Sequence, residues 1–598
     1  MASRLATWEK YLLLATAAFI AIVGVLVIRQ VSVTPDEAIY IATGLTYIQQ
    51  HEERLNLEHP PLEKVLAAIP LLLDGARPSY ESPAWTSPEE VDFSQQSLRS
   101  WGELGARRGF LARLPMVLLT VLLGVTIFWI GRGLAGPWGG FLSLAAYASS
   151  PFFYAYGPLV LTDIGVALFV LLAGWTFASL WQEPSLTKSI WFGLALSGAF
   201  LSKFSSGLLL PVFFVLAIWY VLSPPQPLQV RRALRYSIVG LVISAVVVFA
   251  TYGLLFWKTD LAWLFRYQAD NTNRSKGILA AGAAWAQAHP SLSHAFYPVI
   301  LYLWGVSKTL HTLVRPTFVL GKVYEVGTPL FFPAMFFYKM TPGFLVLSAL
   351  LLLLWLWRRV PGGTAGGRTQ APLHVRAIAL IFVVFTLAAV SSKLNIGLRH
   401  LSVSIAALVA LISLIVSWVS TLRSTRLRTG LLAAAVVAIV ASFGSTLAGF
   451  PDYIGYFNRL KGDRPNYEIA TGADLDWGQS LIELRGYLQQ HQIRSVDFDV
   501  KGSVPEWYLP TLPAFECEKG VPADAEWVAV GASRFITTVG FKIDPAVPVP
   551  HCEYLFHNPY WVNSSGSLYV FHMRPENAGR DAPSSAVPAV LPASSVSK

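Results

Sequence analysis

Long runs of apolar residues recur along the chain and constrain its fold more than any other feature. About eleven of these runs approach the ~20 residues that an α-helix needs to cross a bilayer. Backbone polar groups inside a bilayer must be bonded within the protein, so runs of this length form helices there. Hydrophobic residues make up 54% of the 598 residues and charged residues only 13%, against about 25% charged residues in an ordinary globular protein. The sequence therefore predicts a polytopic α-helical membrane protein.

The predicted spans all end before Pro451. They are Tyr11–Ile28, Leu114–Ile130, Trp138–Tyr156, Ile164–Trp181, Ile190–Leu201, Ser206–Leu222, Tyr236–Trp257, Gly343–Trp357, Ala377–Val390, Leu401–Val419 and Gly430–Phe450.

Basic residues between the runs predict the orientation of the helices, because cytoplasmic loops are enriched in Lys and Arg. If Arg4 and Lys10 are cytoplasmic, every alternate loop that follows is also basic. These loops contain Arg132, Lys188, Arg231, Arg232, Arg235, Arg358, Arg359, Arg368, Arg376, Arg423, Arg426 and Arg428. The pattern predicts a cytoplasmic N-terminus and an external C-terminus. It also explains the formal net charge of +10 by topology, without a nucleic-acid partner.

Two long loops, 29–113 and 258–341, lie outside the membrane in this topology. Ile39–Gln50 and Leu62–Leu73 have the pattern of amphipathic helices that lie on the membrane surface. Leu292–Val306 is apolar enough to be a span, but counting it would place the later basic loops outside. We therefore interpret it as an interfacial or re-entrant helix. Residues 1–450 then form one transmembrane catalytic domain.

The composition changes at Pro451 to that of a soluble α/β domain, predicted over residues 451–574. Gln479–Gln490 has the pattern of a helix, and three segments have the pattern of strands: Ser495–Val500, Trp527–Val530 and Leu568–His572. Residues 575–598 are rich in Ala, Pro and Ser and are predicted to be disordered. The two cysteines, Cys517 and Cys552, are compatible with a disulfide or with two free thiols.

Acidic residues at predicted span ends are the first candidates for chemistry. Asp36 and Glu37, in Thr34-Pro-Asp-Glu-Ala-Ile-Tyr40, follow the first span, and Asp163 precedes the fourth. Ionisable groups beside a membrane span are costly and mark functional sites. A carboxylate there can accept a proton from an acceptor group. For Asp163, a helix N-cap is the alternative.

Cations at the predicted outer face form a second set of candidates. The orientation rule explains cytoplasmic Lys and Arg but not these residues. Together they suit a lipid phosphate, which Arg and Lys bind through charge-assisted hydrogen bonds. Snorkelling to ordinary anionic lipid is the alternative. The set contains Lys203, Arg315, Lys322, Lys339, Lys393, Arg399 and His400.

Asp474, Asp476 and Trp477 form a separate group, because an aromatic ring packs well on a sugar. A cap for the following helix is the alternative reading. Two aspartates alone are weak evidence for a divalent ion such as Mg²⁺ or Mn²⁺, so the sequence assigns no metal ligand and no certain cofactor. The chain has neither a Walker motif nor G-x-G-x-x-G, which favours a lipid-linked sugar donor over a nucleotide sugar.

Several motifs resemble those of known membrane glycosyltransferases. Asp36-Glu37 followed by His59-Pro-Pro-Leu-Glu-Lys64 resembles the first outer loop of protein O-mannosyltransferases, and Leu161-Thr-Asp163 resembles an acidic position shared with aminoarabinose transferases of lipid A. A bacterial subgroup of family 39 is similar at further motifs. These are Tyr302-Leu-Trp-Gly305, Lys339-Met-Thr-Pro342, Lys393-Leu-Asn-Ile-Gly-Leu-Arg-His400, Tyr456-Phe-Asn458 and Leu475-Asp-Trp-Gly-Gln479.

The resemblance implies a GT-C fold and an inverting transferase of the bacterial inner membrane that uses a polyprenyl-phosphate sugar. It implies Asp36 as base, supported by Glu37 and Asp163, and phosphate contacts from cations such as Arg399. The expected substrate-binding residues are His59, Lys64, Lys203, Lys339, Lys393, Arg399, His400, Asp476 and Trp477. The acceptor is a protein, a lipid or a glycan. The chain lacks the MIR modules of eukaryotic protein mannosyltransferases, and Glu63 replaces a frequent Gly. A glycolipid transporter or flippase is the alternative function.

Overall fold

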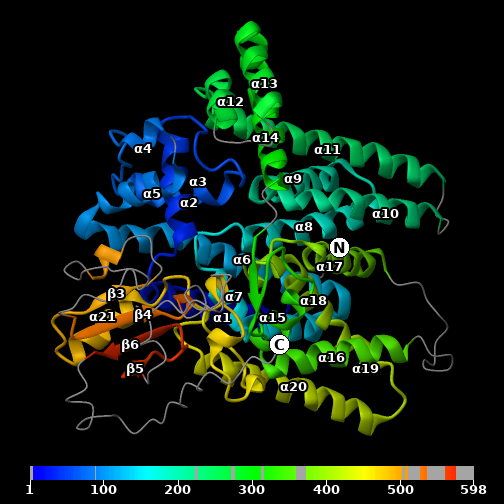
Figure 1. The fold of residues 1–598 in the computed structure, drawn as a ribbon. Helices are drawn as coiled ribbons and strands as arrows, with labels where there is room; N and C mark the ends of the chain where they lie inside the picture. Colours follow the sequence, from blue (N-terminus) through cyan, green and yellow to red (C-terminus); the bar gives the residue numbers. More distant parts are fainter. Residues whose placement is uncertain are drawn as a thin grey trace, which may run out of the picture.

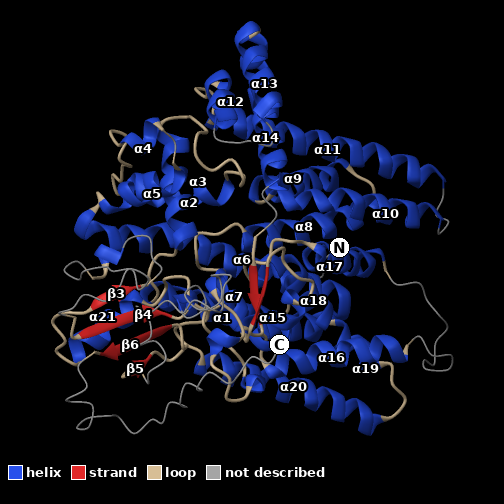
Figure 2. Ribbon diagram, viewed as in Figure 1, coloured by secondary structure: helices blue, strands red, loops and turns tan. Residues whose placement is uncertain are grey.

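The computed structural model describes residues 5–87, 89–222, 227–270, 276–311, 315–358, 372–500, 505–509, 525–534 and 559–573. Helices dominate the fold, and a small sheet lies at one side of the helical body (Figures 1 and 2). Cys517, Cys552 and the predicted tail 575–598 lie outside the described residues.

Among the described residues, eight helical segments are long and apolar enough to cross a membrane, or nine if one strongly bent pair counts as a span. The bent pair is α15 (Phe331–Lys339) with α16 (Pro342–Trp357), at 117° to each other. The protein is thus a multi-pass membrane protein, as predicted. The other helices in these segments are α1 (Thr7–Gln30), α6 (Gly105–Ala148), α8 (Asp163–Gln182), α10 (Leu209–Leu222), α11 (Pro227–Leu255), α17 (Leu373–Ser391), α18 (Ser402–Ile412), α19 (Leu414–Ser420) and α20 (Thr425–Ala448).

Every predicted run falls on a helix, although the count of long spans is smaller. One reason is that α6 contains the second predicted run and most of the third. Its continuity is broken at Ala135 and at Gly136, whose φ is 74°. The Tyr147 hydroxyl then donates to the Thr120 carbonyl at 2.7 Å. The chain therefore reverses at Gly136, and the two runs form antiparallel limbs. Another reason is that α9 (Leu186–Ser202) has only 17 residues.

The first long loop folds into helices that lie beside the spans. These are α2 (Pro35–Gln49), α3 (Leu62–Leu73), α4 (Pro83–Thr86), α5 (Glu90–Arg99) and η1 (Gly102–Leu104). The prediction of a surface position was wrong for α2, because most of its side chains, among them Ile41, Leu45 and Tyr47, are buried. The cause is that α3 and α5 both pack against α2.

The second long loop contains α12 (Leu261–Asp270), α13 (Lys276–Ala288) and α14 (Pro290–His311), followed by the hairpin of β1 (Thr317–Val319) and β2 (Lys322–Tyr324). Figure 1 shows α12 and α13 rising above the other helices. The predicted interfacial segment Leu292–Val306 lies in α14, which is not among the candidate spans. The Tyr297 hydroxyl fixes α14 to α11 through the carbonyl of Gly253.

The C-terminal region contains a four-stranded mixed sheet. Its strands, β3 (Asp497–Asp499), β4 (Trp527–Gly531), β5 (Trp561–Val562) and β6 (Leu568–His572), lie in the order β3-β4-β6-β5. Only β3 and β4 are parallel. Leu484 of α21 (Leu481–Gln490) shares a buried cluster with Phe498 and Val570 of the sheet. The predicted helix and three predicted strands all appear here, and β5 is an additional strand.

Candidate active site

Two carboxylates and two cations from distant parts of the chain meet at the ends of the helices. Arg399 lies in η3 (Leu398–Leu401), just before α18. Its Nη2 lies 2.7 Å from Oδ2 of Asp36, and its Nη1 lies 3.8 Å from Oδ2 of Asp163. The other oxygen of Asp163 lies 2.6 Å from Nζ of Lys203. The sequence predicted that these residues share one face of the membrane, and the structure brings them into direct contact.

The local sequence around Asp36 explains its position. Thr34 has extended backbone before α2, and its amide donates to Oε2 of Glu37 at 2.9 Å. Pro35 occupies the first helical turn, where its missing N–H is not needed. Asp36 is therefore fixed in the first turn, where the helix dipole favours a negative charge.

Exposure distinguishes the three predicted acidic residues. The Asp36 side chain is 32% exposed, whereas those of Asp163 and Glu37 are 2% and 0% exposed. Only Asp36 thus presents a carboxylate that a substrate can approach without displacing protein side chains.

Glu37 is held by a buried ion pair with Arg113 of α6. Its Oε1 accepts from Arg113 Nε and its Oε2 from Arg113 Nη2, both at 2.7 Å. The Val160 amide donates to the same carboxylate at 3.0 Å. Arg113 also donates to the carbonyls of Val31 and Ser32 at 2.8 Å. This pair joins α2, α6 and the segment before α8, so Glu37 organises the site rather than facing a substrate.

The turn that carries Arg399 is fixed from the C-terminal region. Asp474 accepts from the Leu398 amide at 3.0 Å and from the Tyr156 hydroxyl at 2.8 Å. The Arg399 guanidinium lies 4.4 Å from the centre of the Trp477 ring, a cation–π contact. Arg399 is buried, and its Nε has no hydrogen-bond partner among the described residues. Asp474 ends η6 (Gly472–Asp474), and Trp477 lies in the loop that follows. These two residues complete the site.

The two histidines lie close to this cluster. The His59 ring is 5.3 Å from the ring of Tyr40 in α2. Burial, together with the charges of Lys64 and Lys203, lowers the pKa of His59 to about 4, so His59 is neutral at pH 7. His400 is within electrostatic range of Lys203 and Asp163.

Three other predicted substrate-binding residues make hydrogen bonds within the protein. Lys64 is fully buried and donates to the Tyr47 hydroxyl at 2.9 Å and to the Asn56 and His59 carbonyls at 2.8 Å. Lys339, also buried, donates to the carbonyls of Ile454 and Asp474. Asp476 accepts from the Gly478 and Ser533 amides at 3.3 and 3.0 Å. Their polar atoms are therefore committed to internal hydrogen bonds.

Lys393 is exposed, and no described ion pair places it at the cluster. Within the part of the chain that the structure describes, no group of three or more His, Cys, Asp or Glu side chains is arranged to hold a metal ion.

Arg113 and Tyr156 are the site residues that sequence reasoning missed. Arg113 has a usable signal, because it precedes the second predicted span at the predicted outer face. The criterion that selected Lys203 and Arg399 also applies to it. Tyr156 carries no comparable signal, since an aromatic residue at a span end is common.

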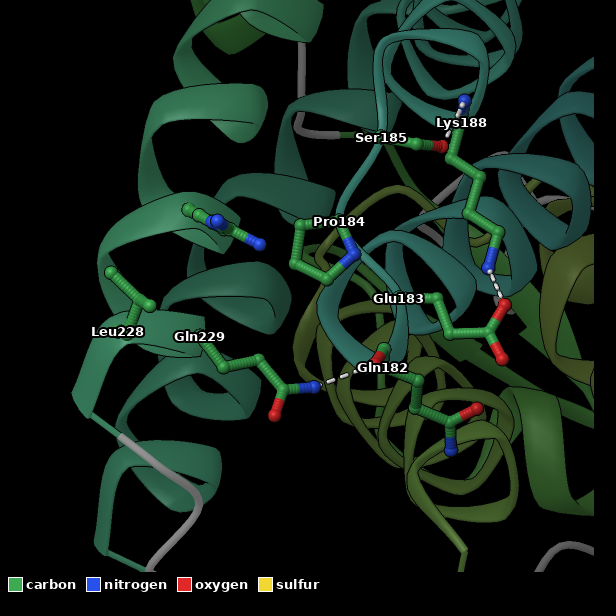
Figure 3. A pocket seen from close by; sticks show the side chains of 8 residues that line it. Gln182, Glu183, Pro184, Ser185, Lys188, Leu228 and Gln229 are labelled. Atoms are coloured by element: carbon green, nitrogen blue, oxygen red, sulfur yellow. Dashed lines mark hydrogen bonds and ion pairs between the residues drawn. The ribbon is translucent and has the colours of Figure 1, made fainter.

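A cavity of about 390 Å³ lies elsewhere, at the α8–α9 connection and the start of α11 (Figure 3). Lys188 there pairs with Glu183 at 2.7 Å, and Gln229 donates to the Gln182 carbonyl at 2.6 Å. Asp163 and Gln182 are the opposite ends of α8, about 30 Å apart at 1.5 Å per residue. This cavity is therefore not part of the acidic site.

Residues 102–257 match the family model described as dolichyl-phosphate-mannose-protein mannosyltransferase. The family predicted from the motifs is confirmed over this part of the chain. The matched, mannosyltransferase-like stretch includes Arg113, Asp163 and Lys203 of the site. No curated protein sequence matches the chain.

Similar solved structures belong to two kinds of transferase. The structure of the S. cerevisiae protein O-mannosyltransferase Pmt1–Pmt2 complex bound to the sugar donor is 18% identical, with a TM-score of 0.32, over 43% of this chain and 34% of that one. ArnT from Cupriavidus metallidurans bound to undecaprenyl phosphate is 14% identical, with a TM-score of 0.43, over 96% of this chain and 100% of that one. The alignment thus spans about a third of the yeast chain.

Proposed function

We propose that this chain is a glycosyltransferase that moves a sugar from a polyprenyl-phosphate donor to an acceptor, with inversion, at the outer face of a bacterial inner membrane. The donor chemistry is suggested by the matched family and by the similar structures bound to a sugar donor or to undecaprenyl phosphate. The contact between Asp36 and Arg399 is the observation that carries the proposal. It supports a role for Asp36 as a base beside a cation suited to phosphate.

The proposed reaction is a single displacement. A hydroxyl or amine of the acceptor attacks the anomeric carbon of the donor sugar, and its proton passes to the Asp36 carboxylate. The bond from the anomeric carbon to the phosphate oxygen breaks, and the phosphate leaves with the electron pair. The guanidinium of Arg399 then stabilises the charge that gathers on the phosphate. Attack from the face opposite the leaving group inverts the anomeric carbon.

The remaining polar residues position these two groups. Asp163 holds Lys203 and faces Arg399, so it keeps both cations at the site. Glu37 fixes the start of α2 through Arg113. Trp477 covers the Arg399 guanidinium, and the neutral His59 and the ring of His400 lie near this cluster. We propose a protein, lipid or glycan as the acceptor.

We further propose residues 1–450 as the catalytic membrane domain and residues 451–574 as an external α/β domain with a C-terminal tail. Reporter fusions at Gly363 and after residue 598 test this orientation. A cytoplasmic C-terminal reporter would overturn the outer-face assignment.

The transporter alternative gains no support from the described spans. A transporter of charged substrates places ionisable residues at mid-membrane depth. The acidic residues of the described candidate spans are Glu9, Glu103 and Asp163, each within the first three residues of its segment.

Sugar transfer by purified protein in nanodiscs tests the proposal. The donor is a polyprenyl-phosphate sugar, and the readout is release of polyprenyl phosphate. We expect D36N to lose at least about 10²-fold in kcat, the usual contribution of a general base. The matched control D92N changes an exposed aspartate outside the site and should retain the wild-type rate. A wild-type rate in D36N would overturn the assignment of the base.

A further inference from the structure

A second cavity lies next to the candidate active site, and four arginines contribute to its lining. It has a volume of about 320 Å³ and lies between the end of α1, the start of α6, α21 and Tyr508. Its walls include Arg29, Arg107, Arg113 and Arg485, together with Phe110 and Tyr508. The arginines come from three elements that are far apart in the sequence.

The charge of this cavity is unbalanced. None of its lining residues is an Asp or a Glu. Arg113 is neutralised by Glu37, and Arg107 by Asp74 at 2.6 Å on an arginine side chain that is 64% exposed. Arg29 and Arg485 have no carboxylate partner among the described residues. At least two guanidinium groups thus face the cavity without a counter-charge.

The position of the cavity separates it from ordinary basic loops. Arg29 ends α1, whereas Glu9, at the other end of this helix, pairs with Arg132 at 3.0 Å. The enrichment of Lys and Arg in cytoplasmic loops therefore explains Arg132 and not Arg29, if the proposed orientation holds. Arg29 and Arg485 are exposed, and together with Arg107 and Arg113 they converge from three elements on this cavity.

We propose that this cavity binds a phosphate-bearing group, as free phosphate or as the headgroup of an anionic lipid, at a site separate from Arg399. Guanidinium groups recognise phosphate oxygens through paired hydrogen bonds. Arg29, at the end of a predicted span, is placed where lipid phosphates lie. The partly buried Phe110 ring, over which the Arg29 guanidinium lies at 5.6 Å, offers an apolar wall for the adjoining glycerol or chain.

Two residues of the cavity wall, Tyr508 and Arg113, contact the segment that precedes Asp36. Tyr508 accepts a hydrogen bond from the Val33 amide at 3.1 Å, and Arg113 holds the carbonyls of Val31 and Ser32. These residues form the segment that enters α2 just before Asp36. A phosphate bound here therefore stabilises the same segment that positions the base.

Binding of dioctanoyl phosphatidic acid to the purified full-length protein tests the proposal. We expect R29A/R485A to weaken this binding at least about tenfold, because each lost charge-assisted contact weakens affinity by about that factor. The matched control R423A/R426A removes two exposed arginines, one just before α20 and one in its first turn, and should bind like the wild type. Equal affinity of R29A/R485A and the wild type would overturn the proposal.

Competition experiments identify the ligand, and two further variants serve as controls. Competition by inorganic phosphate indicates recognition of phosphate itself, and its absence indicates a headgroup presented with its lipid. Dioctanoyl phosphatidylcholine should compete weakly, because its headgroup is neutral overall. If R29A/R485A does not fold, R485E at the exposed position on α21 should show the same loss. D36N should still bind dioctanoyl phosphatidic acid. Failure of the proposed sugar-transfer function can therefore be distinguished from failure of this binding proposal.

Discussion

Glu37 and Arg113 form a two-pronged ion pair with both N–O distances at 2.7 Å and both side chains almost completely buried. The residues are neighbours in space only, since α2 and α6 are separated by α3, α4, α5 and η1. Their pairing connects the segment before Asp36 to the bundle. The adjacent carboxylates Asp36 and Glu37 therefore have different environments, one accessible and one enclosed.

Breaking this pair is expected to destabilise the protein strongly. Glu37→Gln leaves Arg113 as a buried charge without a counter-charge, which typically costs about 3–5 kcal/mol. Thermal unfolding in nanodiscs measures the effect. Asp74→Asn, which breaks the pairs of Asp74 with the exposed Arg107 and with the largely buried Arg108, offers a comparison at the same end of α6. If E37Q unfolds at the wild-type temperature, the pair does not organise the site.

Trp477 is expected to act on the donor through Arg399. Trp477→Phe retains a ring under the guanidinium, whereas Trp477→Ala removes it. A desolvated cation–π contact contributes up to about 2 kcal/mol, so W477A should raise the donor KM by up to about 30-fold, with a smaller change in W477F. Steady-state kinetics with varied donor concentration measure this. Equal KM values in W477A and the wild type would contradict a role in positioning Arg399.

Lys203 is expected to keep Asp163 charged and oriented. Lys203→Met removes the contact at 2.6 Å and leaves only Arg399, at 3.8 Å, to face this carboxylate. We expect a loss of about 10²-fold in kcat/KM, since misplaced groups at a reaction centre have effects of this size. Lys203→Arg, which keeps the charge, should recover part of the loss. Lys188→Met, in the first turn of α9 and beyond the far end of α8, is the control and should leave transfer unchanged.

The sequence predicted the spans well because each depends on local properties, namely apolar length and the charges that follow it. It also assigned Asp36, Asp163, Lys203 and Arg399 to one predicted face, because topology alone assigns span ends to faces. Their direct contact became visible only in the structure. The burial of α2 was not predictable in this way. It depends on α3 and α5, which cover a helix that looks amphipathic by itself.

The roles of individual cations were less predictable than their location. Lys64, Lys203 and Lys339 look alike in sequence, yet two are enclosed by backbone carbonyls and only Lys203 pairs with a site carboxylate. The partners of Lys339 come from the C-terminal region, more than a hundred residues away. No local pattern reports contacts of that range.

Glu63 provides a pH-dependent prediction outside the spans. Its carboxyl group is fully buried, has no hydrogen-bond partner among the described residues, and packs against Gly165 in the first turn of α8. A side chain at residue 165 would collide with the Glu63 carboxyl group. The motif that Glu63 belongs to often has Gly at this position, and here Glu63 packs against a Gly of α8 instead. Burial raises the pKa of Glu63 from 4.5 to about 8.

The sign of the effect follows from proton binding. Below pH 4.5 Glu63 is protonated in both the folded and the unfolded chain, and wild type and Glu63→Gln should be equally stable in this respect. As the pH rises from 4.5 towards 8, the unfolded chain loses this proton while the folded chain retains it, so the wild type loses stability by up to about 1.4 kcal/mol per pH unit. The advantage of E63Q should grow over this window and level off above pH 8. Unfolding temperatures of both proteins at several pH values measure it, with E103Q at an exposed site as the control. A constant difference between E63Q and wild type across the window would show that Glu63 is ionised in the folded protein.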